Sequence, residues 1–341
     1  MGEYCHNLAL ALGKQGREAG IEYTFLWPEA DVPQLDCGVD IEKVSLRRKL
    51  FPWSCQSYDL WHSTHQDSRY WPATAGEKLV LTIHDLNFLG EKNEAKVISR
   101  IKRLQKKMDR ANVITVISEY TKAQVEQHLL PHGKPIHCVY NGVAALSDQP
   151  GAIPSALPRD CVAHPFLLYL GVVRKKKNVH VLPALMAGLP QYNLVIAGGV
   201  DPEYRTQIQT EIDRYQIGAR VFFLGEVNDP EKVWLYKNCE AFLFPSLLEG
   251  FGIPVIEAMQ FGKPVFISNQ SSLPEVAGPE AYVWESFDAT AMTERFLAGM
   301  ADFSSDADKK NRLKKHASRF SWEKAAREYT NIYKAVLDIK T

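Results

Sequence analysis

The sequence predicts an α/β protein of two domains, each built around a parallel sheet. The chain has 341 residues, of which 45% are hydrophobic and 23% charged, and this length is too great for a single hydrophobic core. Short apolar segments alternate with amphipathic stretches along most of the chain, which favours βαβ units. The alternation stops once, between residues 146 and 165. We therefore expect one domain on each side of that break.

The first domain is expected over residues 1–145. A helix should open the chain, because Leu8, Ala11 and Leu12 share one helical face, and a polar stretch follows at 13–20. The strands that we expect next lie at 21–27, 58–63, 78–84, 112–118 and 135–143. Strands that alternate with helical patterns in this way predict a Rossmann-like domain.

A linker and a second domain follow. Residues 146–165 are rich in proline, alanine and polar residues and show neither a helical nor a strand period, which indicates a linker. The alternation then resumes, with strands expected at 166–171, 192–199, 221–226, 241–246 and 263–268. These predict a second Rossmann-like domain over 166–319. Residues 320–341 show apolar side chains at helical spacing, so we expect a C-terminal helix that packs back on the first domain.

Composition excludes several classes of protein. Forty basic and forty acidic side chains give no net charge, so no global field attracts nucleic acid. No run of about 18 apolar residues and no signal segment is visible, and we expect a cytoplasmic protein. The cysteines form no CxxC pair and are predicted to be reduced thiols: Cys5, Cys37, Cys55, Cys138, Cys161 and Cys239.

One segment carries the strongest chemical signal. Glu249 and Glu257 stand eight residues apart, on either side of a glycine-rich turn at Gly250 and Gly252. An apolar helix should follow from Ile253, after a strand, and ligands of open α/β sheets bind at the carboxyl ends of strands beside helix N-termini. Either acid alone would more often be a solvated surface residue. The whole pattern is far more specific and predicts a ligand site.

Several motifs together resemble a known family. They are LEGFGIPVIEAM (248–259), SSLPEVAG (271–278), YLGVVRKKKN (169–178), LVIAGG (194–199), FLGEV (223–227), TVISEYTK (115–122) and VYNGV (139–143). With them the sequence resembles the retaining glycosyltransferases of family 4, which share a Glu-x(7)-Glu motif. The resemblance implies the GT-B fold, in which two Rossmann-like domains with parallel sheets face a cleft. It also implies a metal-independent enzyme without a cofactor.

The resemblance assigns a donor-binding site to the second domain. Glu257 should bind the ribose hydroxyls of a nucleotide sugar, Glu249 the transferred sugar, and Lys177 the diphosphate. The backbone amides expected to hold the sugar and the diphosphate are those of Gly250, Phe251, Gly252 and Ile253. Val172 stands where the family often has an arginine, so Arg174 or Lys175 is expected to replace it, and Val227 is placed on the donor side.

In the first domain, histidines follow two expected strands. The resemblance places His84 beside the donor sugar, although a histidine with satisfied hydrogen bonds at a strand end is the simpler interpretation. His62 and His65 have an HxxH spacing, but no cluster supplies a third metal ligand, so we expect no metal there. These two histidines, with Asp85, Gly2 and Glu3, are candidate acceptor-side residues.

The resemblance also predicts a defect in the first domain. Family members have a strand and a glycine-rich loop before the helix that here begins near Glu3, and only Met1 and Gly2 of that loop are present. We therefore expect the first sheet to lack its first strand.

Residues 92–110 predict a basic amphipathic helix. The segment has eight basic and two acidic residues around an apolar face. Such a helix can lie on anionic lipid, although a packed helix with a solvated face is more common.

Donor and acceptor are expected only by class. The KKKN and SSLPEVAG motifs resemble members that use GDP-mannose in bacterial surface polysaccharide (lipopolysaccharide) synthesis, with a UDP-hexose as the other donor and a glycan or lipid-linked acceptor. The alternatives are an epimerase or phosphorylase on the same fold, and a pseudoenzyme or assembly partner that binds a nucleotide sugar without transfer. A dinucleotide-dependent dehydrogenase is disfavoured, because no GxGxxG follows an early strand.

Overall fold

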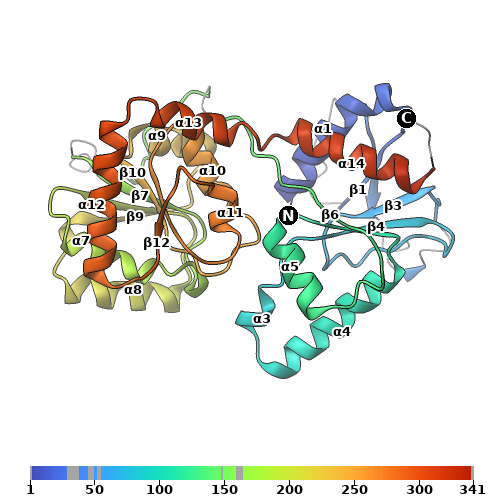
Figure 1. The fold of residues 1–341 in the computed structure, drawn as a ribbon, viewed down its shortest axis with the longest axis horizontal. Helices are drawn as coiled ribbons and strands as arrows, with labels where there is room; N and C mark the ends of the chain where they lie inside the picture. Colours follow the sequence, from blue (N-terminus) through green and yellow to red (C-terminus); the bar gives the residue numbers. More distant parts are fainter. Residues whose placement is uncertain are drawn as a thin grey trace. The chain divides into compact units, whose positions relative to one another are not determined.

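The computed structural model describes residues 2–28, 38–44, 50–51, 55–146, 149–158 and 164–338, and it has an α/β fold (Figure 1). The chain divides into two compact units. Unit 1 comprises residues 1–144 and 320–341, and unit 2 comprises residues 145–319.

Unit 2 is built on one parallel sheet in the order β12-β11-β10-β7-β8-β9. Its strands are β7 (Phe166–Leu170), β8 (Asn193–Ala197), β9 (Val221–Gly225), β10 (Ala241–Phe244), β11 (Val265–Ser268) and β12 (Tyr282–Trp284). Every residue of β7, β8, β10 and β11 is buried, as expected for parallel strands with helices on both faces. The helices are α7 (Leu182–Ala187), α8 (Pro202–Arg214), α9 (Asp229–Asn238), α10 (Ile253–Gln260), α11 (Leu273–Ala277), α12 (Ala289–Ser305) and α13 (Lys309–Ala317).

The carboxyl ends of two central strands lie very close together. Gly198, after β8, has a φ of +127°, and a Cβ added to it would lie 2.1 Å from the carbonyl oxygen of Gly171, after β7. Only glycine fits such a contact. Gly198 of the LVIAGG motif, the first residue after β8, is therefore needed for the chain to turn at this edge of the sheet.

Unit 1 contains a four-stranded parallel sheet in the order β3-β4-β5-β6. Its strands are β3 (Leu60–Ser63), β4 (Lys78–Ile83), β5 (Val113–Val116) and β6 (Ile136–Cys138). Successive side chains of β4 point to opposite faces. Leu79, Leu81 and Ile83 pack with residues of α4 (Glu94–Arg110) and α5 (Glu119–His128), while Val80 packs on the other face. A short helix, α3 (Phe88–Glu91), precedes α4.

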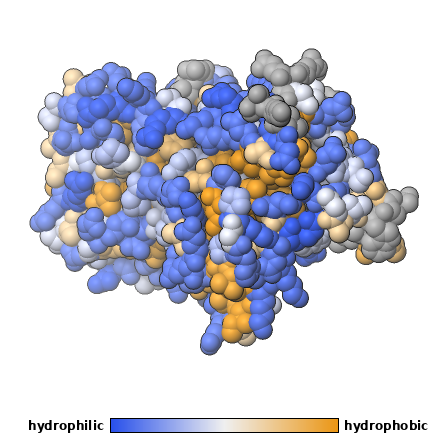
Figure 2. All heavy atoms as spheres, turned by 45° about the vertical axis from the view of Figure 1, so that its right-hand side comes forward, coloured by the Kyte–Doolittle hydropathy of each residue, from blue (hydrophilic) through white to orange (hydrophobic). Residues whose placement is uncertain are grey.

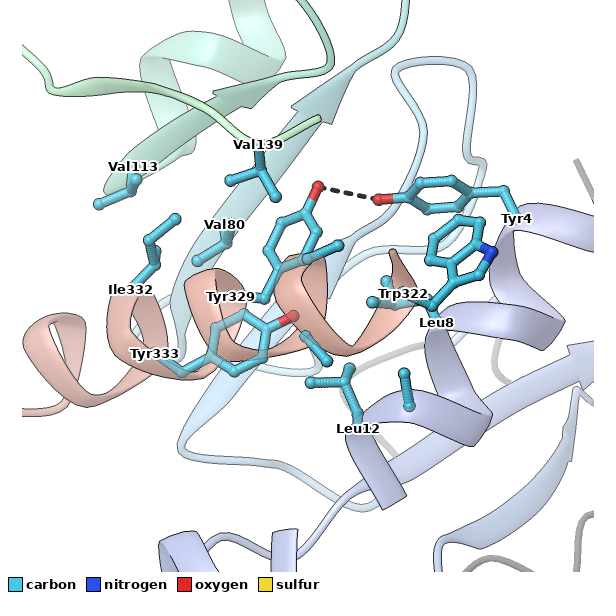
Figure 3. Close-up of a cluster of buried hydrophobic side chains, with 13 residues drawn as sticks. Tyr4, Leu8, Leu12, Val80, Val113, Val139, Trp322, Tyr329, Ile332 and Tyr333 are labelled. Atoms are coloured by element: carbon cyan, nitrogen blue, oxygen red, sulfur yellow. Dashed lines mark hydrogen bonds between the residues drawn. The ribbon is translucent and has the colours of Figure 1, made fainter. Parts of the chain in front are cut away.

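The second face of this sheet is covered by the two ends of the chain. α1 (Gly2–Ala19) lies beside α14 (Trp322–Val336), and their apolar residues form one cluster with Val80, Val113 and Val139 (Figure 3). The hydroxyls of Tyr4 and Tyr329 share a buried hydrogen bond of 2.8 Å. The C-terminal helix is thus part of unit 1.

Two further strands of unit 1 form a sheet of their own. β1 (Thr24–Pro28) pairs in parallel with β2 (Asp40–Val44), and in the part of the chain that the structure describes neither joins the four-stranded sheet.

The expected opening helix spans Gly2–Ala19 and includes most of the polar stretch at 13–20. The sequence-based expectations differ from the structure in two places. Strands β2 and β12 were not expected. The expected linker is not free of unit 2, since Ala152 N donates to Pro230 O at 2.9 Å and Ser155 N to Glu231 Oε1 at 3.2 Å.

Candidate functional site in unit 2

The loop after β10 leads directly into α10 and places Glu249 at the carboxyl edge of the sheet. Gly252 is the N-cap of α10 with a φ of +101°, and no side chain caps this helix end. Ser272 Oγ donates to the carbonyl oxygens of Glu249 and Phe251 at 3.2 and 3.1 Å, and the Glu249 amide donates to Ser271 Oγ at 3.1 Å. The SSLPEVAG motif therefore holds the loop, and the uncapped helix end favours an anion.

Lys177 and Glu249 form an ion pair at this edge. Lys177 ends a short 3₁₀ turn (Lys175–Lys177) after β7, and its Nζ donates to Glu249 Oε1. The two side chains are only 15% and 12% exposed. Lys177 Nζ also lies 5.3 Å from the centre of the Phe244 ring. One buried cation and one buried carboxylate are thus brought together from neighbouring strands β7 and β10.

Glu257 is held by two residues of α9. Tyr236 Oη donates to Glu257 Oε2 at 2.8 Å, and Lys232 Nζ donates to Glu257 Oε1 at 3.3 Å. Burial alone would lower the pKa of Lys232, but Glu257 and Asp229 together raise it above its ordinary value. Burial, and then the charge of Glu257, raise the pKa of Tyr236. Both carboxylate oxygens of Glu257 are therefore fixed in place, and Lys232 is a permanent cation.

The remaining donor-side candidates are more exposed. Arg174 and Lys175 are exposed at the start of the turn that carries Lys177. Val172 is 50% exposed and offers no charge where the family often has arginine. Val227 is half-buried just after β9, before the N-cap of α9. Of the basic residues in this turn, Lys177 is the one that forms an ion pair with Glu249.

In unit 1, His65 and His84 lie together at the carboxyl end of the sheet. Their ring centres are 4.8 Å apart. His84 Nε2 lies 2.8 Å from the carbonyl oxygen of Thr64, which can only accept, so this nitrogen carries the proton. Burial, and then His65, lower the pKa of His84 to about 4. His84 is therefore a neutral imidazole with Nε2 hydrogen-bonded to the backbone, and its position at the strand end agrees with both interpretations offered by the sequence.

The other first-domain candidates do not form one cluster with these two. His62 is half-buried, and its two ring nitrogens each lie 2.7 Å from a hydroxyl, Tyr333 Oη and Thr82 Oγ1, so both are hydrogen-bonded within unit 1. Asp85 Oδ1 accepts from the Asn87 amide in a local turn. Gly2 and Glu3 begin α1, with Glu3 exposed. Among the described residues, no group of three or more His, Cys, Asp or Glu side chains could hold a metal ion.

Sequence reasoning missed the residues that fix the two glutamates. Lys232 and Tyr236 stand four residues apart, which places them on one face of a helix. That spacing was visible in the sequence, but nothing in it showed that this face meets Glu257. Ser271 and Ser272 lie inside a motif that the resemblance used, without a role for either hydroxyl.

Two family models match adjoining parts of the chain. Residues 1–145 match the model described as Glycosyltransferase Family 4, and residues 162–320 match the model described as Glycosyl transferases group 1. The O-antigen chain mannosyltransferase B of Escherichia coli is 28% identical over 279 residues, which cover 76% of this chain and 70% of that protein. The serotype-specific mannosyltransferase WbdA of the same species is 32% identical over 47% of this chain, but the match covers only 20% of WbdA.

Solved structures share the fold. A sucrose-phosphate synthase from Thermosynechococcus elongatus has a TM-score of 0.75 at 20% identity, covering 96% of this chain and 92% of that one. Anabaena HepE, solved in complex with UDP and glucose, has a TM-score of 0.72 at 16% identity, covering 96% of both chains. The fold is GT-B. Over the described residues, no helix combines the length and apolarity needed to cross a bilayer.

Proposed function

Since this chain belongs to glycosyltransferase family 4, we propose that it is a retaining enzyme that moves a hexose from a nucleotide diphosphate sugar to a glycan or lipid-linked acceptor. The observation that carries the proposal is the buried pair of Lys177 and Glu249 beside the uncapped N-terminus of α10. A lysine and a helix end suit a diphosphate, and a carboxylate suits sugar hydroxyls.

The proposed roles follow from how each residue is held. Glu257 accepts hydrogen bonds from the ribose hydroxyls, since Lys232 and Tyr236 already keep its oxygens in position. Lys177 exchanges part of its contact with Glu249 for the diphosphate. Glu249 then turns to the sugar, while the amides of Gly250, Phe251, Gly252 and Ile253 face the sugar and phosphate oxygens, and Arg174 and Lys175 add positive charge at the mouth of the site.

The proposed reaction breaks the bond between sugar C1 and the diphosphate oxygen and forms a bond from C1 to the acceptor oxygen on the same face. The acceptor proton passes to the departing phosphate. Lys177 and the end of α10 stabilise the negative charge that develops on the diphosphate, which is the contribution of a preorganised electrostatic site. We propose that no metal is required for this step, and that the neutral imidazole of His84 lies beside the donor sugar.

Mannose from GDP-mannose is the donor that we favour, with a UDP-hexose as the alternative. Relatives named mannosyltransferases support this choice, among them proteins of O-antigen synthesis. We therefore propose a role in bacterial surface polysaccharide synthesis. A cytoplasmic location is part of the same proposal, and Cys5, Cys55 and Cys239, which form no disulfide among the described residues, are compatible with a reducing compartment.

Turnover of sugar nucleotides tests the proposal. The purified chain is incubated with GDP-mannose, UDP-glucose, UDP-galactose or UDP-GlcNAc, with and without octyl α-mannoside, and the released nucleotide and the anomeric configuration of any product are measured. We expect one nucleotide class to be consumed and an α-linked product from an α-linked donor. A β-linked product would overturn retention. Donor binding without transfer to this or any lipid-linked acceptor would favour the non-catalytic alternative.

We further propose that α4 contacts anionic lipid. Lys96, Lys102, Arg103 and Lys106 are exposed along this helix, Lys92 is exposed just before it, and Ile98 is 46% exposed among them. Figure 2 shows an apolar strip flanked by hydrophilic residues on the lowest part of the molecule, where α3 and α4 lie in Figure 1. Much of the helix's apolar face is used for packing, since Leu104 and Met108 are buried.

Vesicle flotation tests the lipid contact. We expect the chain to float with vesicles of phosphatidylglycerol and phosphatidylcholine but not with phosphatidylcholine alone, because each basic residue near an anionic surface contributes about 1 kcal/mol. The variant Lys102→Glu/Lys106→Glu should lose flotation, whereas Lys310→Glu/Lys314→Glu in unit 2 should keep it. Equal flotation of both variants would contradict a role for α4.

A further inference from the structure

The turn that carries Lys177 is anchored to the rest of unit 2 on both sides of that lysine. On one side, the carbonyl oxygen of Lys176 accepts hydrogen bonds from Leu247 N at 2.8 Å and Ser246 Oγ at 3.4 Å. Ser246 and Leu247 belong to the loop after β10, which also carries Glu249. This first anchor therefore ties together the two loops that supply the ion pair of Lys177 and Glu249.

The second anchor holds His180, which lies three residues beyond Lys177. Tyr204 Oη, on α8, accepts a hydrogen bond from the His180 amide at 3.1 Å and lies 2.8 Å from His180 Nδ1. Among the described residues, this ring nitrogen is the only acceptor bonded to the hydroxyl, so Tyr204 donates its own proton to the ring. One hydroxyl on a side chain that is only 4% exposed thus holds both the backbone and the ring of His180.

The protonation states of Tyr204 and His180 keep this double contact intact at neutral pH. Burial raises the pKa of Tyr204 to about 12, although hydrogen bonds from the backbone of His180 and Val179 oppose the shift. Burial lowers the pKa of His180, an effect that Glu211 opposes and Lys175 reinforces. Tyr204 therefore retains the proton that it donates, and the His180 ring stays neutral and accepts it.

Asn178 connects Lys177 to the second anchor through an unusual backbone conformation. Its φ is +56°, in the left-handed region, and it is 5% exposed. Asparagine enters this region more readily than most residues, but a residue other than glycine stays there only where surrounding contacts fix the chain. The contact of His180 with Tyr204 is one of those contacts, so its loss would release the backbone next to Lys177.

The Lys177 amine is held in a place that leaves little room for displacement. Its Nζ donates to Glu249 and lies 5.3 Å from the centre of the Phe244 ring, and the side chain is 15% exposed. In the proposed function this amine stabilises the charge that develops on the diphosphate. Such stabilisation depends on preorganised geometry, and a misplacement of about 1 Å costs up to about a hundredfold in rate.

We propose that Tyr204 is a positioning residue for sugar transfer, because its hydroxyl fixes the turn at His180 and thereby holds the Lys177 amine where it meets the diphosphate. Tyr204 acts through Lys177 and touches neither donor nor acceptor, since its side chain is buried and its hydroxyl is bonded within unit 2. This inference rests on the proposed function, in which Lys177 binds the diphosphate.

Two matched tyrosine variants of the full chain test this inference by kinetics. Tyr204→Phe removes only the hydroxyl, and Tyr215→Phe is the control, because Tyr215 is the C-cap of the same helix and its hydroxyl has no hydrogen bond to any described residue. We expect Tyr204→Phe to lower kcat about tenfold and to change the donor KM less than about threefold. Tyr215→Phe should match the wild type. In the Lys177→Met background, Tyr204→Phe should cause no further loss, since the amine that it positions is gone.

A chemical measurement that needs no nucleotide follows the Lys177 amine directly. Acetic anhydride labels lysine amines, and peptide mass spectrometry compares the labelling rate of Lys177 with that of exposed Lys310. We expect Tyr204→Phe to speed labelling of Lys177 at least about fivefold relative to Lys310, because a loosened turn opens more often, and Tyr215→Phe to leave it unchanged. His180→Ala removes only the ring contact, so it should give a smaller increase and tests the same anchor if Tyr204→Phe does not fold.

Unchanged kcat together with unchanged labelling of Lys177 would overturn the proposal, whether in Tyr204→Phe or, if that variant does not fold, in His180→Ala. Tyr204→Phe losses of kcat that are equal in the wild-type and Lys177→Met backgrounds would overturn it as well, because Tyr204 would then act independently of Lys177. A wild type that transfers no sugar from any donor contradicts the proposed function instead, and labelling of Lys177 still decides whether Tyr204 fixes its amine.

Discussion

The two units differ in how their parallel sheets are built. Unit 2 has one continuous six-stranded sheet, and its charged site residues are paired across neighbouring strands and helices. Unit 1 has a four-stranded sheet and a separate two-stranded one, with a cavity between them and neutral histidines at its strand ends. The comparison indicates that the ion-paired residues of the candidate site all belong to unit 2.

The largest expected effect is a loss of sugar transfer when either residue of the Lys177–Glu249 ion pair in unit 2 is replaced. Glu249→Gln and Lys177→Met should each lower kcat by two to three orders of magnitude, because in the proposed function each removes a group that contacts the sugar or the diphosphate. The measurement is nucleotide release from the preferred donor. A variant that keeps more than a tenth of the kcat would contradict the assignment of that residue.

The same pair should also matter for stability. Lys177→Met leaves a carboxylate that is 12% exposed without its partner, and should lower the free energy of unfolding by about 3–5 kcal/mol. The double variant Lys177→Met/Glu249→Gln should recover most of that loss and none of the activity. As the control in unit 1, Lys324→Met removes an exposed pair with Glu328 and should cost about 0.5 kcal/mol or less, measured by urea unfolding. Similar losses of unfolding free energy in Lys177→Met and Lys324→Met would show that burial of the Lys177–Glu249 pair does not increase its contribution to stability.

Positioning of Glu257 gives a smaller kinetic effect. Lys232→Met and Tyr236→Phe free one carboxylate oxygen each, so we expect KM for the donor to rise about tenfold while kcat changes little. Asp229→Asn is the matched control, because Asp229 contacts Lys232 at 3.1 Å but is 78% exposed. If kcat fell and KM stayed constant, Lys232 and Tyr236 would act on the reacting centre instead.

The stability of unit 1 should fall at acid pH because of His62. Burial, and then the neighbouring His84, lower the pKa of His62 to about 3, well below the ordinary value of about 6.5. The unfolded chain therefore binds the proton first, so the full stability is present above pH 6.5 and is lost as the pH falls toward 3. At pH 5 the loss should be about 2 kcal/mol. Thermal unfolding of the wild type and His62→Gln at pH 7 and 5 checks this, and a pH response that is the same in both would exclude His62 as its source.

The smallest expected effect is a difference in stability and donor affinity between alanine variants of two glycines with positive φ. Gly252→Ala places a Cβ 2.6 Å from Leu273 Cδ2 in unit 2, whereas Gly133→Ala in unit 1 meets no atom within 4 Å. The backbone penalty of about 1–2 kcal/mol applies to both, so only the first should lose additional stability and donor affinity. Equal loss in both variants would show that the turn before α10 tolerates a side chain.

The fold and the donor candidates were predictable to different degrees. The α/β class and the strands of unit 2 followed from short apolar segments, because buried parallel strands are apolar throughout. β2 could not be predicted, since Asp40, Glu42 and Lys43 give it no apolar pattern. The partners of Glu257 could not be predicted either, because their contact depends on how α9 packs against α10. The hydrogen bonds of His62 could not be predicted for the same reason, because its partner Tyr333 lies 271 residues away in sequence.

Calorimetric titration measures whether unit 2 binds a nucleotide sugar, as we propose. GDP, GDP-mannose, UDP and UDP-glucose are titrated into the full chain and into Glu257→Ala and Lys177→Ala, each first shown to be folded by circular dichroism. We expect one nucleotide class to bind the wild type and both variants to lose that binding. Binding that persists unchanged in both variants, or no binding of either class, would contradict it.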